Sequence, residues 1–219
     1  MTYKAIILDM DGTLVNTERL WKDAERALLA AYDRTYDTVI HADFLGLAVT
    51  DFIPAVQHAY DLKHIDTKEL EDNLENRVRA LLETDAKPTD GAIDLINYIV
   101  EQAISCAIAS NSSHGIIQAT LRHQRWADPI TKRYSADDVP NAKPAPDLFL
   151  YAAEQLNTEP QDCIVIEDSL NGVKAAVSAG MTCLAVPDFE LSDINTFKAL
   201  TPHIFESLTE ALPFIQQHT

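Results

Sequence analysis

The sequence has few basic residues for its length. Lysine and arginine together number 17 of 219 residues, against 34 aspartates and glutamates, so the formal net charge is −17. A field of that sign repels phosphate backbones and anionic lipid surfaces. We therefore expect neither nucleic acid nor a membrane as a partner, although a single pocket or a metal ion can still concentrate positive charge.

Cysteines are also few, and long apolar runs are lacking. Cys106, Cys163 and Cys183 each lie in a short apolar stretch without a CxxC spacing, which is typical of reduced, buried thiols. The apolar runs fall short of the roughly 18 residues that a membrane span needs, and the first residues, MTYKAIILDMDG, do not resemble a secretory signal. The histidines form neither HxH nor HExxH. We expect a cytoplasmic protein without a zinc site.

What the sequence does contain is typical of a globular α/β protein, with 47% hydrophobic and 23% charged residues. Short apolar runs bounded by turn residues indicate strands buried on both faces of a parallel sheet. We predict such strands at 5–8, 104–109, 163–166, 182–186 and 203–205. Helical patterns lie between them, at 91–100, 146–156 and 172–179. This alternation predicts a doubly wound parallel sheet, a Rossmann-like core.

One long segment, residues 17–84, breaks this alternation, since its apolar positions repeat only with helical spacing. Inserted after the first strand, it would lie over the carboxyl end of that strand, where ligands bind in such sheets. We therefore predict an α/β catalytic core made of residues 1–16 and 85–219, with residues 17–84 forming a mobile helical cap.

Two aspartates, Asp9 and Asp11, follow the first predicted strand and precede Gly12. Two residues apart at the end of an extended strand, both carboxylates can point into one cavity, and the glycine lets the backbone turn sharply. One carboxylate can attack an electrophile while the other transfers a proton. Taken alone, an Asp-x-Asp pair is as well explained by two carboxylates that cap a loop.

Three further signals favour a site. Ser110 directly follows a predicted strand and precedes a helix, a place that suits a phosphate oxygen, with an ordinary helix-capping serine as the alternative. Lys143 precedes the segment PAPD, which holds it at a helix start where it can neutralise a carboxylate and a phosphate. Glu167 and Asp168 end a buried strand side by side and repel each other unless a cation joins them. Oxygen-only ligands suit Mg²⁺.

Four segments, in this order, resemble the four motifs of the haloacid dehalogenase-like hydrolase superfamily: ILDMDGTLVNTE, AIASNSS, AKPAPDLFLYAAEQL and CIVIEDSLNGVKAAVSAGM. The last two are similar to those of the cap-bearing group that includes β-phosphoglucomutases and sugar-phosphate phosphatases. The resemblance covers nearly the whole chain. It implies a Rossmann-like core with a cap domain, and phosphoryl transfer to an aspartate.

The resemblance also implies roles for single residues. Asp9 would be the nucleophile that forms an aspartyl-phosphate, and Asp11 the general acid and base. Ser110, Asn111 and Lys143 would bind the phosphate group.

The same resemblance implies a Mg²⁺ site. The ion would be held by the side chain of Asp9, the backbone carbonyl of Asp11 and the acids of the fourth motif. Asp168 is expected as a direct ligand, and Glu167 as a ligand either directly or through water. A metal ion lets an anionic carboxylate approach an anionic phosphate, which explains how so acidic a protein can bind phosphate esters.

The choice of reaction depends on the cap. Dehalogenases lack the second acid of the first motif, so Asp11 argues against them. β-Phosphoglucomutases carry a cap histidine where this chain has Trp21, and basic residues beside the cap-loop glycine, where this chain reads FLGLAVT around Gly46. We therefore favour a phosphatase acting on a small phosphomonoester, such as a sugar phosphate, with a hexose phosphate mutase as the alternative. A phospho-accepting receiver domain fits less well, because its acceptor lies on a middle strand.

The cap is expected to select the substrate, a small phosphorylated metabolite. Trp21, Leu45, Gly46, Leu47 and Arg77 are candidates to face the site. Packing within the cap is the alternative for the apolar side chains, and ion pairing on a solvated helix is the alternative for the arginine. Because cap and core of one chain can form a complete site, we expect a monomer.

Overall fold

The core of the molecule is a five-stranded parallel sheet. In the computed structural model, which describes residues 2–42, 44, 46–189 and 192–219, the strand order is β5-β4-β1-β6-β7. The strands are β1 (Ala5–Leu8), β4 (Ser105–Ser110), β5 (Arg133–Ser135), β6 (Cys163–Glu167) and β7 (Thr182–Ala185). The doubly wound parallel sheet is thereby confirmed. Strand order reverses at β1, which is where open α/β sheets bind ligands.

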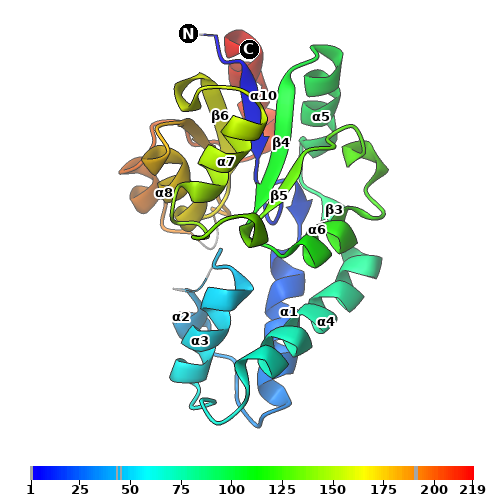
Figure 1. Ribbon diagram of the computed structural model, residues 1–219, viewed down its shortest axis with the longest axis vertical. Helices are drawn as coiled ribbons and strands as arrows, with labels where there is room; N and C mark the ends of the chain where they lie inside the picture. Colours follow the sequence, from blue (N-terminus) through cyan, green and yellow to red (C-terminus); the bar gives the residue numbers. More distant parts are fainter. Residues whose placement is uncertain (1, 43, 45, 190–191) are drawn as a thin grey trace.

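Helices cover both faces of this sheet (Figure 1). One face carries α5 (Ala92–Glu101), α6 (His114–Leu121) and α10 (Leu208–His218), and the other carries α7 (Asp147–Gln155), α8 (Leu170–Ser178) and α9 (Ile194–Lys198). Short 3₁₀ turns lie at Arg125–Ala127, Ala136–Asp138 and Pro160–Asp162. Along β1, Ile6 and Leu8 pack against the first set of helices, and Ala5 and Ile7 against the second. Both faces of β1 are therefore buried, which explains its continuous apolar sequence.

One predicted strand is wrong, and β5, α9 and α10 have no counterpart among the predicted elements. The run at 203–205 is not a strand, because it forms a single bridge between Ile204 and Ala185 before the chain turns into α10. The sequence pattern also does not indicate β5, because this edge strand of three residues contains no apolar run. The predicted helices at 91–100, 146–156 and 172–179 correspond to α5, α7 and α8, with ends that differ by at most two residues.

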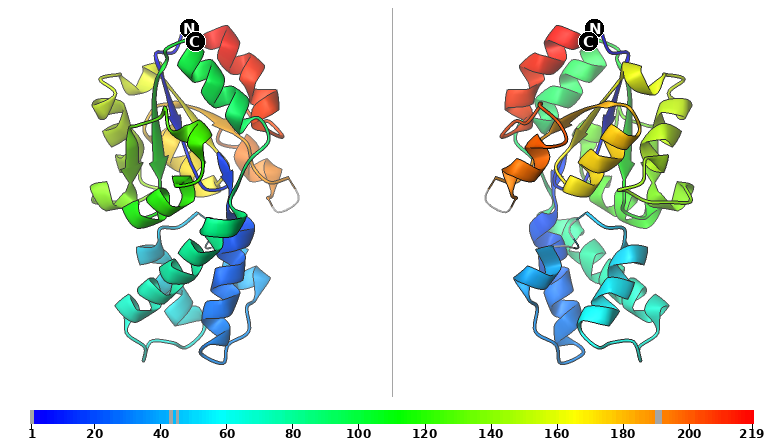
Figure 2. Two further views of the ribbon diagram at one scale, coloured as in Figure 1. Left: turned by 90° about the vertical axis from the view of Figure 1, so that its right-hand side faces the viewer. Right: turned by 90° about the vertical axis from the view of Figure 1, so that its left-hand side faces the viewer.

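Four helices form a cap at one end of the core (Figure 1, Figure 2): α1 (Glu18–Ala30), α2 (Thr38–Ala42), α3 (Val49–Ala59) and α4 (Thr67–Asp85). Helices α1, α3 and α4 enclose their own apolar cluster, which includes Leu28, Ile53 and Leu74. The chain enters and leaves the cap through the short antiparallel strands β2 (Val15–Asn16) and β3 (Lys87–Pro88). We propose that residues 17–84 act as a separate domain, because this strand pair brings both connections together.

The cap contacts the core through α4 and α6. Ile116 of α6 belongs to the apolar cluster of the cap, and the guanidinium of Arg79 on α4 occupies the space where a Cβ at Gly115 would lie. The chain termini lie at the far end of the core (Figure 2), where the Tyr3 amide donates to the carbonyl of His218 at 2.7 Å. In the described part of the chain, no helix is both long and apolar enough to cross a membrane.

Candidate active site

Three neighbouring strands end at polar or charged side chains. Asp9 follows β1, Ser110 ends β4, and Glu167 ends β6. Because these strands are parallel, their carboxyl ends meet at one edge of the sheet, and that edge faces the cap. A cavity of about 560 Å³ lies there. Its wall includes every core residue of the predicted site: Asp9, Asp11, Ser110, Asn111, Lys143, Glu167 and Asp168.

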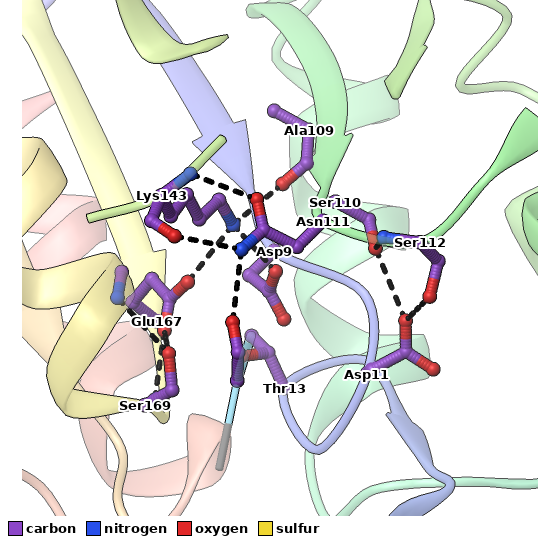
Figure 3. Close-up of polar contacts among 12 residues, drawn as sticks. Asp9, Asp11, Thr13, Ala109, Ser110, Asn111, Ser112, Lys143, Glu167 and Ser169 are labelled. Carbon is purple, nitrogen blue, oxygen red and sulfur yellow. Dashed lines mark hydrogen bonds and ion pairs between the residues drawn. The ribbon is translucent and has the colours of Figure 1, made fainter. Parts of the chain in front are cut away.

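Lys143 lies at the centre of this cluster, fully buried (Figure 3). Its Nζ donates hydrogen bonds to Oδ1 of Asp9 at 2.7 Å, to Oε1 of Glu167 at 2.9 Å and to the carbonyl of Ala109 at 2.9 Å. The ammonium also lies 4.6 Å from the ring centre of Phe149, a cation–π contact. A buried charge is tolerated only when it is paired. These contacts therefore hold the ammonium between the ends of β1 and β6.

The charges in this cluster do not balance. Burial raises the pKa of Asp9 to about 8, although the Lys143 ammonium opposes the shift. Burial, with repulsion from Glu167 and Asp9, also raises the pKa of Asp168. Burial lowers the pKa of Lys143, but the two carboxylates beside it outweigh this effect and the net shift is upward. With all groups ionised, three carboxylates face one ammonium, which leaves two negative charges uncompensated.

The acidic residues of this cluster fit a divalent cation. In the described part of the chain, Asp9, Glu167 and Asp168 each offer a carboxylate oxygen, and these oxygens lie within 4.8 Å of one another. Hard oxygen donors of this kind bind Mg²⁺ or Ca²⁺, and a charge of +2 matches the excess. Gly12 makes room for this arrangement, because a Cβ there would overlap the carboxylate of Asp168.

Hydroxyl groups orient both acids at the end of β6. Oε2 of Glu167 accepts hydrogen bonds from the backbone N–H and the hydroxyl of Ser169, at 2.7 and 2.9 Å. Oδ1 of Asp168 accepts from the hydroxyl of Thr13 at 3.0 Å. Gly172 lies so close to Glu167 that any Cβ would overlap its carboxylate. Both carboxylate oxygens of Glu167 thus have protein partners: Oε1 accepts from Lys143, and Oε2 accepts from Ser169.

The carboxylate of Asp11 accepts hydrogen bonds from both the cap and the core. Its Oδ1 accepts from the Thr17 hydroxyl at 2.8 Å and from Nε1 of Trp21 at 3.3 Å. Its Oδ2 accepts from the hydroxyls of Ser110 and Ser112, at 3.1 and 2.8 Å. In Figure 3, Asp11 lies apart from the cluster around Lys143. The two predicted catalytic aspartates thus line one cavity, with Asp9 bonded to Lys143 and Asp11 held by hydroxyl groups and an indole.

The predicted cap residues differ in their placement. Trp21, Gly46 and Leu47 line the cavity, and the indole of Trp21 bonds directly to Asp11. Arg77 is not among the described residues of the cavity wall; its Nε donates to Asn73, one turn earlier on α4, at 2.6 Å. We therefore leave Arg77 out of the site. Leu45 lies outside the described residues.

Several polar side chains of the site are not singled out by the sequence motifs. Thr13, Thr17, Ser112 and Ser169 each donate a hydrogen bond to a motif acid. A local signal exists for Ser169, which turns back to Glu167 two residues earlier, whereas Thr13 and Ser112 bond to acids more than 100 residues away in the sequence. The serine that caps α6 is Ser113, whose side chain accepts from the backbone N–H of Ile116.

Comparison with known proteins places this site in a family. The family model for haloacid dehalogenase-like hydrolases matches residues 6–186. The chain is 33% identical over 184 residues to a bifunctional riboflavin kinase/FMN phosphatase of Arabidopsis thaliana, covering 83% of this chain and 48% of that protein. The chain thus spans about half the length of that relative.

Two further proteins match over nearly their whole length. A probable pseudouridine-5′-phosphatase of Drosophila melanogaster is 32% identical over 213 residues, covering 94% of this chain and 90% of that protein. The crystal structure of CbbY from Rhodobacter sphaeroides in complex with xylulose-(1,5)bisphosphate has a TM-score of 0.84 and 26% identity, covering 95% of this chain and 96% of that one. The chain therefore belongs to the haloacid dehalogenase-like hydrolase family, and both curated relatives described above are named as phosphatases.

Proposed function

We propose that this protein is a Mg²⁺-dependent phosphatase that hydrolyses a small phosphomonoester through an aspartyl-phosphate at Asp9. The observation that carries the proposal is the position of this carboxylate. It is buried at the end of β1, lies 2.7 Å from Nζ of Lys143, and faces the same cavity as Asp11. A carboxylate can attack an anionic phosphate when nearby positive charge offsets their repulsion.

Asp9 and Asp11 together can carry out every bond change and proton transfer of the hydrolysis. A carboxylate oxygen of Asp9 forms a bond to phosphorus, and the bond between phosphorus and the ester oxygen breaks. Protonated Asp11 gives its proton to that oxygen, so the alcohol leaves neutral. Asp11 then takes a proton from a water molecule whose oxygen attacks phosphorus, and the bond from phosphorus to Asp9 breaks. One water is consumed, and both aspartates return to their first state.

Three residues would bind the phosphate oxygens. Lys143 would supply positive charge; its three N–H groups donate to Asp9, Glu167 and the carbonyl of Ala109, so one of these bonds would give way to a phosphate oxygen. The hydroxyl of Ser110, which donates to Asp11 at 3.1 Å in the free site, would turn to a phosphate oxygen. Asn111 follows Ser110 and lines the cavity; its side-chain amide donates to the carbonyls of Gly46 and Lys143, and one of these two bonds would give way to a phosphate oxygen.

Mg²⁺ is the cation that we assign to the acidic cluster. Asp9 and Asp168 would hold it through their side chains, Asp11 through its backbone carbonyl, and Glu167 directly or through water. When bound, the ion neutralises the charge between carboxylate and phosphate. The uncompensated charge of the cluster and the spacing of its oxygens support this assignment.

The substrate that we propose is a sugar phosphate or a related metabolite. A solved relative with a bound xylulose bisphosphate supports this class, and so does a relative named for a nucleoside 5′-phosphate. The cavity of about 560 Å³ has room for such a molecule. We propose a monomer as the active form, because cap and core of one chain together line the cavity.

We infer hydrolysis rather than a mutase reaction from Trp21. Its indole donates to Asp11 at 3.3 Å, at the position where β-phosphoglucomutases carry a histidine. An indole N–H is a donor only and cannot exchange protons with a sugar hydroxyl. Conversion of β-glucose 1-phosphate to glucose 6-phosphate, with little free phosphate, would show that the mutase alternative is correct.

The deciding experiment is phosphate release from a panel of phosphorylated metabolites, with and without Mg²⁺. Metal-dependent release is expected from the wild type and not from Asp9→Asn, which keeps the shape of the side chain and removes the nucleophile. Asp162→Asn is the matched control, because Asp162 pairs with Lys4 at the opposite end of the strands. Turnover by Asp9→Asn at the wild-type rate would contradict the aspartyl-phosphate.

A further inference from the structure

The carboxylate of Asp11 already accepts as many hydrogen bonds as its two oxygens can hold. A carboxylate has about four acceptor positions, two at each oxygen. Oδ1 accepts from Thr17 and Trp21 of the cap, and Oδ2 accepts from Ser110 and Ser112 of the core (Figure 3). A general acid has to bring one oxygen against the ester oxygen of the substrate. One of the four donors must therefore leave before Asp11 can act.

Ser110 is the donor that a bound phosphate would draw away. A hydroxyl has a single hydrogen, so Ser110 can donate either to Asp11 or to a phosphate oxygen, but not to both. The oxygen of this hydroxyl accepts from the backbone N–H of Ser112 at 3.0 Å, which holds the oxygen in place while the hydrogen turns. Phosphate binding would thus open one side of Oδ2 of Asp11, and Oδ1 would keep both of its donors.

Ser112 is fixed so that its own hydroxyl stays on Oδ2. The residue is buried, and its hydroxyl donates to Oδ2 of Asp11 at 2.8 Å, the shorter of the two bonds to this oxygen. Its carbonyl accepts from the hydroxyl of Ser135 at 2.7 Å, and Ser135 is fully buried at the end of β5. Both backbone polar groups of Ser112 are therefore paired within the core, and its single hydroxyl hydrogen is directed at the acid.

We propose that Ser112 is a positioning residue for proton transfer at Oδ2 of Asp11. Once the phosphate has drawn the hydrogen of Ser110 away, Ser112 is the serine that still bonds to this oxygen and keeps it beside the ester oxygen. The proton passes from Oδ2 to the ester oxygen as the bond from that oxygen to phosphorus breaks. In the second step Oδ2 takes a proton from water as the water oxygen bonds to phosphorus. This inference rests on the proposed phosphatase function and adds which oxygen of Asp11 moves the proton.

The test is Ser112→Ala, measured as kcat/KM on phenyl phosphate and on 4-nitrophenyl phosphate. The two esters are similar in shape, but 4-nitrophenolate is a stable anion that leaves with little help from an acid. Phenolate is more basic and needs the proton, and kcat/KM reports the steps up to its departure. If the acid is mispositioned, we expect a loss of about tenfold or more on phenyl phosphate and of less than about twofold on 4-nitrophenyl phosphate.

Two further variants separate this role from packing. Ser112→Cys fills the same space with a weak donor, so it should show the same selective loss. Ser113→Ala removes the neighbouring hydroxyl, which bonds to the backbone of α6, and should leave the ratio between the two esters unchanged. Equal losses on both esters in Ser112→Ala, no loss on either, or full activity of Ser112→Cys would overturn the inference. Failure of the proposed function itself would look different, as release of phosphate from both esters by Asp9→Asn at the wild-type rate.

Discussion

The side-chain amide of Asn111, at the end of β4 in the core, donates a hydrogen bond to the backbone carbonyl of Gly46 in the cap, 2.9 Å away. The same amide donates to the carbonyl of Lys143 at 3.1 Å, and its oxygen accepts from the N–H of Lys143 at 3.0 Å. A Cβ at Gly46 would lie 2.9 Å from that of Ser169, so the cap loop approaches the core closely at this point. One asparagine therefore ties the cap to the loop that carries the buried lysine.

Replacing Asn111 by alanine should weaken substrate binding more than the chemical step. The change removes the bond to Gly46 and the support of the Lys143 loop, each contributing about 1 kcal/mol to the closed arrangement. We expect KM to rise by about tenfold with a smaller change in kcat. Asn141→Ala is the matched variant, because Asn141 bonds to Asp147 on the exposed surface. An unchanged KM would show that closure does not depend on this bond.

Lys143→Met should both inactivate and destabilise the protein. The substitution keeps the length of the side chain but leaves the buried carboxylates of Asp9 and Glu167 without their shared cation. Removing one partner of a buried ion pair costs about 3–5 kcal/mol. We expect a loss of that size in the free energy of unfolding, measured in urea at neutral pH without metal.

A second variant shows whether the loss of stability in Lys143→Met comes from uncompensated charge or from poorer packing of the new side chain. In the double variant Lys143→Met/Glu167→Gln one of the unpaired charges is gone, so part of the stability should return while activity stays absent. Lys4→Met should leave the urea midpoint unchanged, since Lys4 is 69% exposed in its pair with Asp162. If the double variant is no more stable than the single one, uncompensated charge is not the cause.

Much of the fold follows from local pattern because a central parallel strand must be apolar throughout. That requirement makes β1, β4 and β6 visible as short apolar runs, and β7 is buried and apolar as well, although it lies at the other edge of the sheet. An edge strand has no such requirement: β5 contains Arg133 and Tyr134, both half-buried, and pairs only with β4. The run at 203–205 is apolar at Ile204 for another reason, since it packs on the core beside β7 without joining the sheet for more than one bridge.

The acids and the lysine of the site are predictable because their chemistry requires fixed residue types at strand ends. Their partners are less predictable, because several residue types can donate a hydrogen bond. The hydroxyl that holds Asp168 comes from Thr13, which is 155 residues away in the sequence. The place of His41 among the residues that line the cavity is harder still to predict, since it depends on how the cap helices pack and not on any motif.

The affinity for Mg²⁺ should rise with pH. Burial raises the pKa of Asp9 to about 8 and that of Asp168 well above its usual value, so below these pKa values the metal must displace a proton. Above them the carboxylates are already ionised and no proton is lost. Between pH 6 and pH 8 we therefore expect the Mg²⁺ concentration for half-maximal binding to fall, by up to about tenfold per pH unit for each displaced proton. Calorimetric titration in two buffers of different ionisation enthalpy would count the protons, and a count of zero would contradict this linkage.

Gly12→Ala should weaken Mg²⁺ binding, and Gly180→Ala is the control variant with the same kind of backbone strain. Both glycines have positive φ, 82° and 75°, so alanine at either position carries a similar backbone strain of about 1–2 kcal/mol. The surroundings differ: a Cβ at Gly12 would overlap the carboxylate of Asp168, whereas at Gly180 none of the described atoms lies within 4 Å. We expect similar losses of thermal stability from the two variants, but only Gly12→Ala should need about tenfold or more Mg²⁺ for half-maximal activity. Equal Mg²⁺ requirements would mean that the displaced carboxylate is not a ligand, and the assignment of Asp168 to the metal would be wrong.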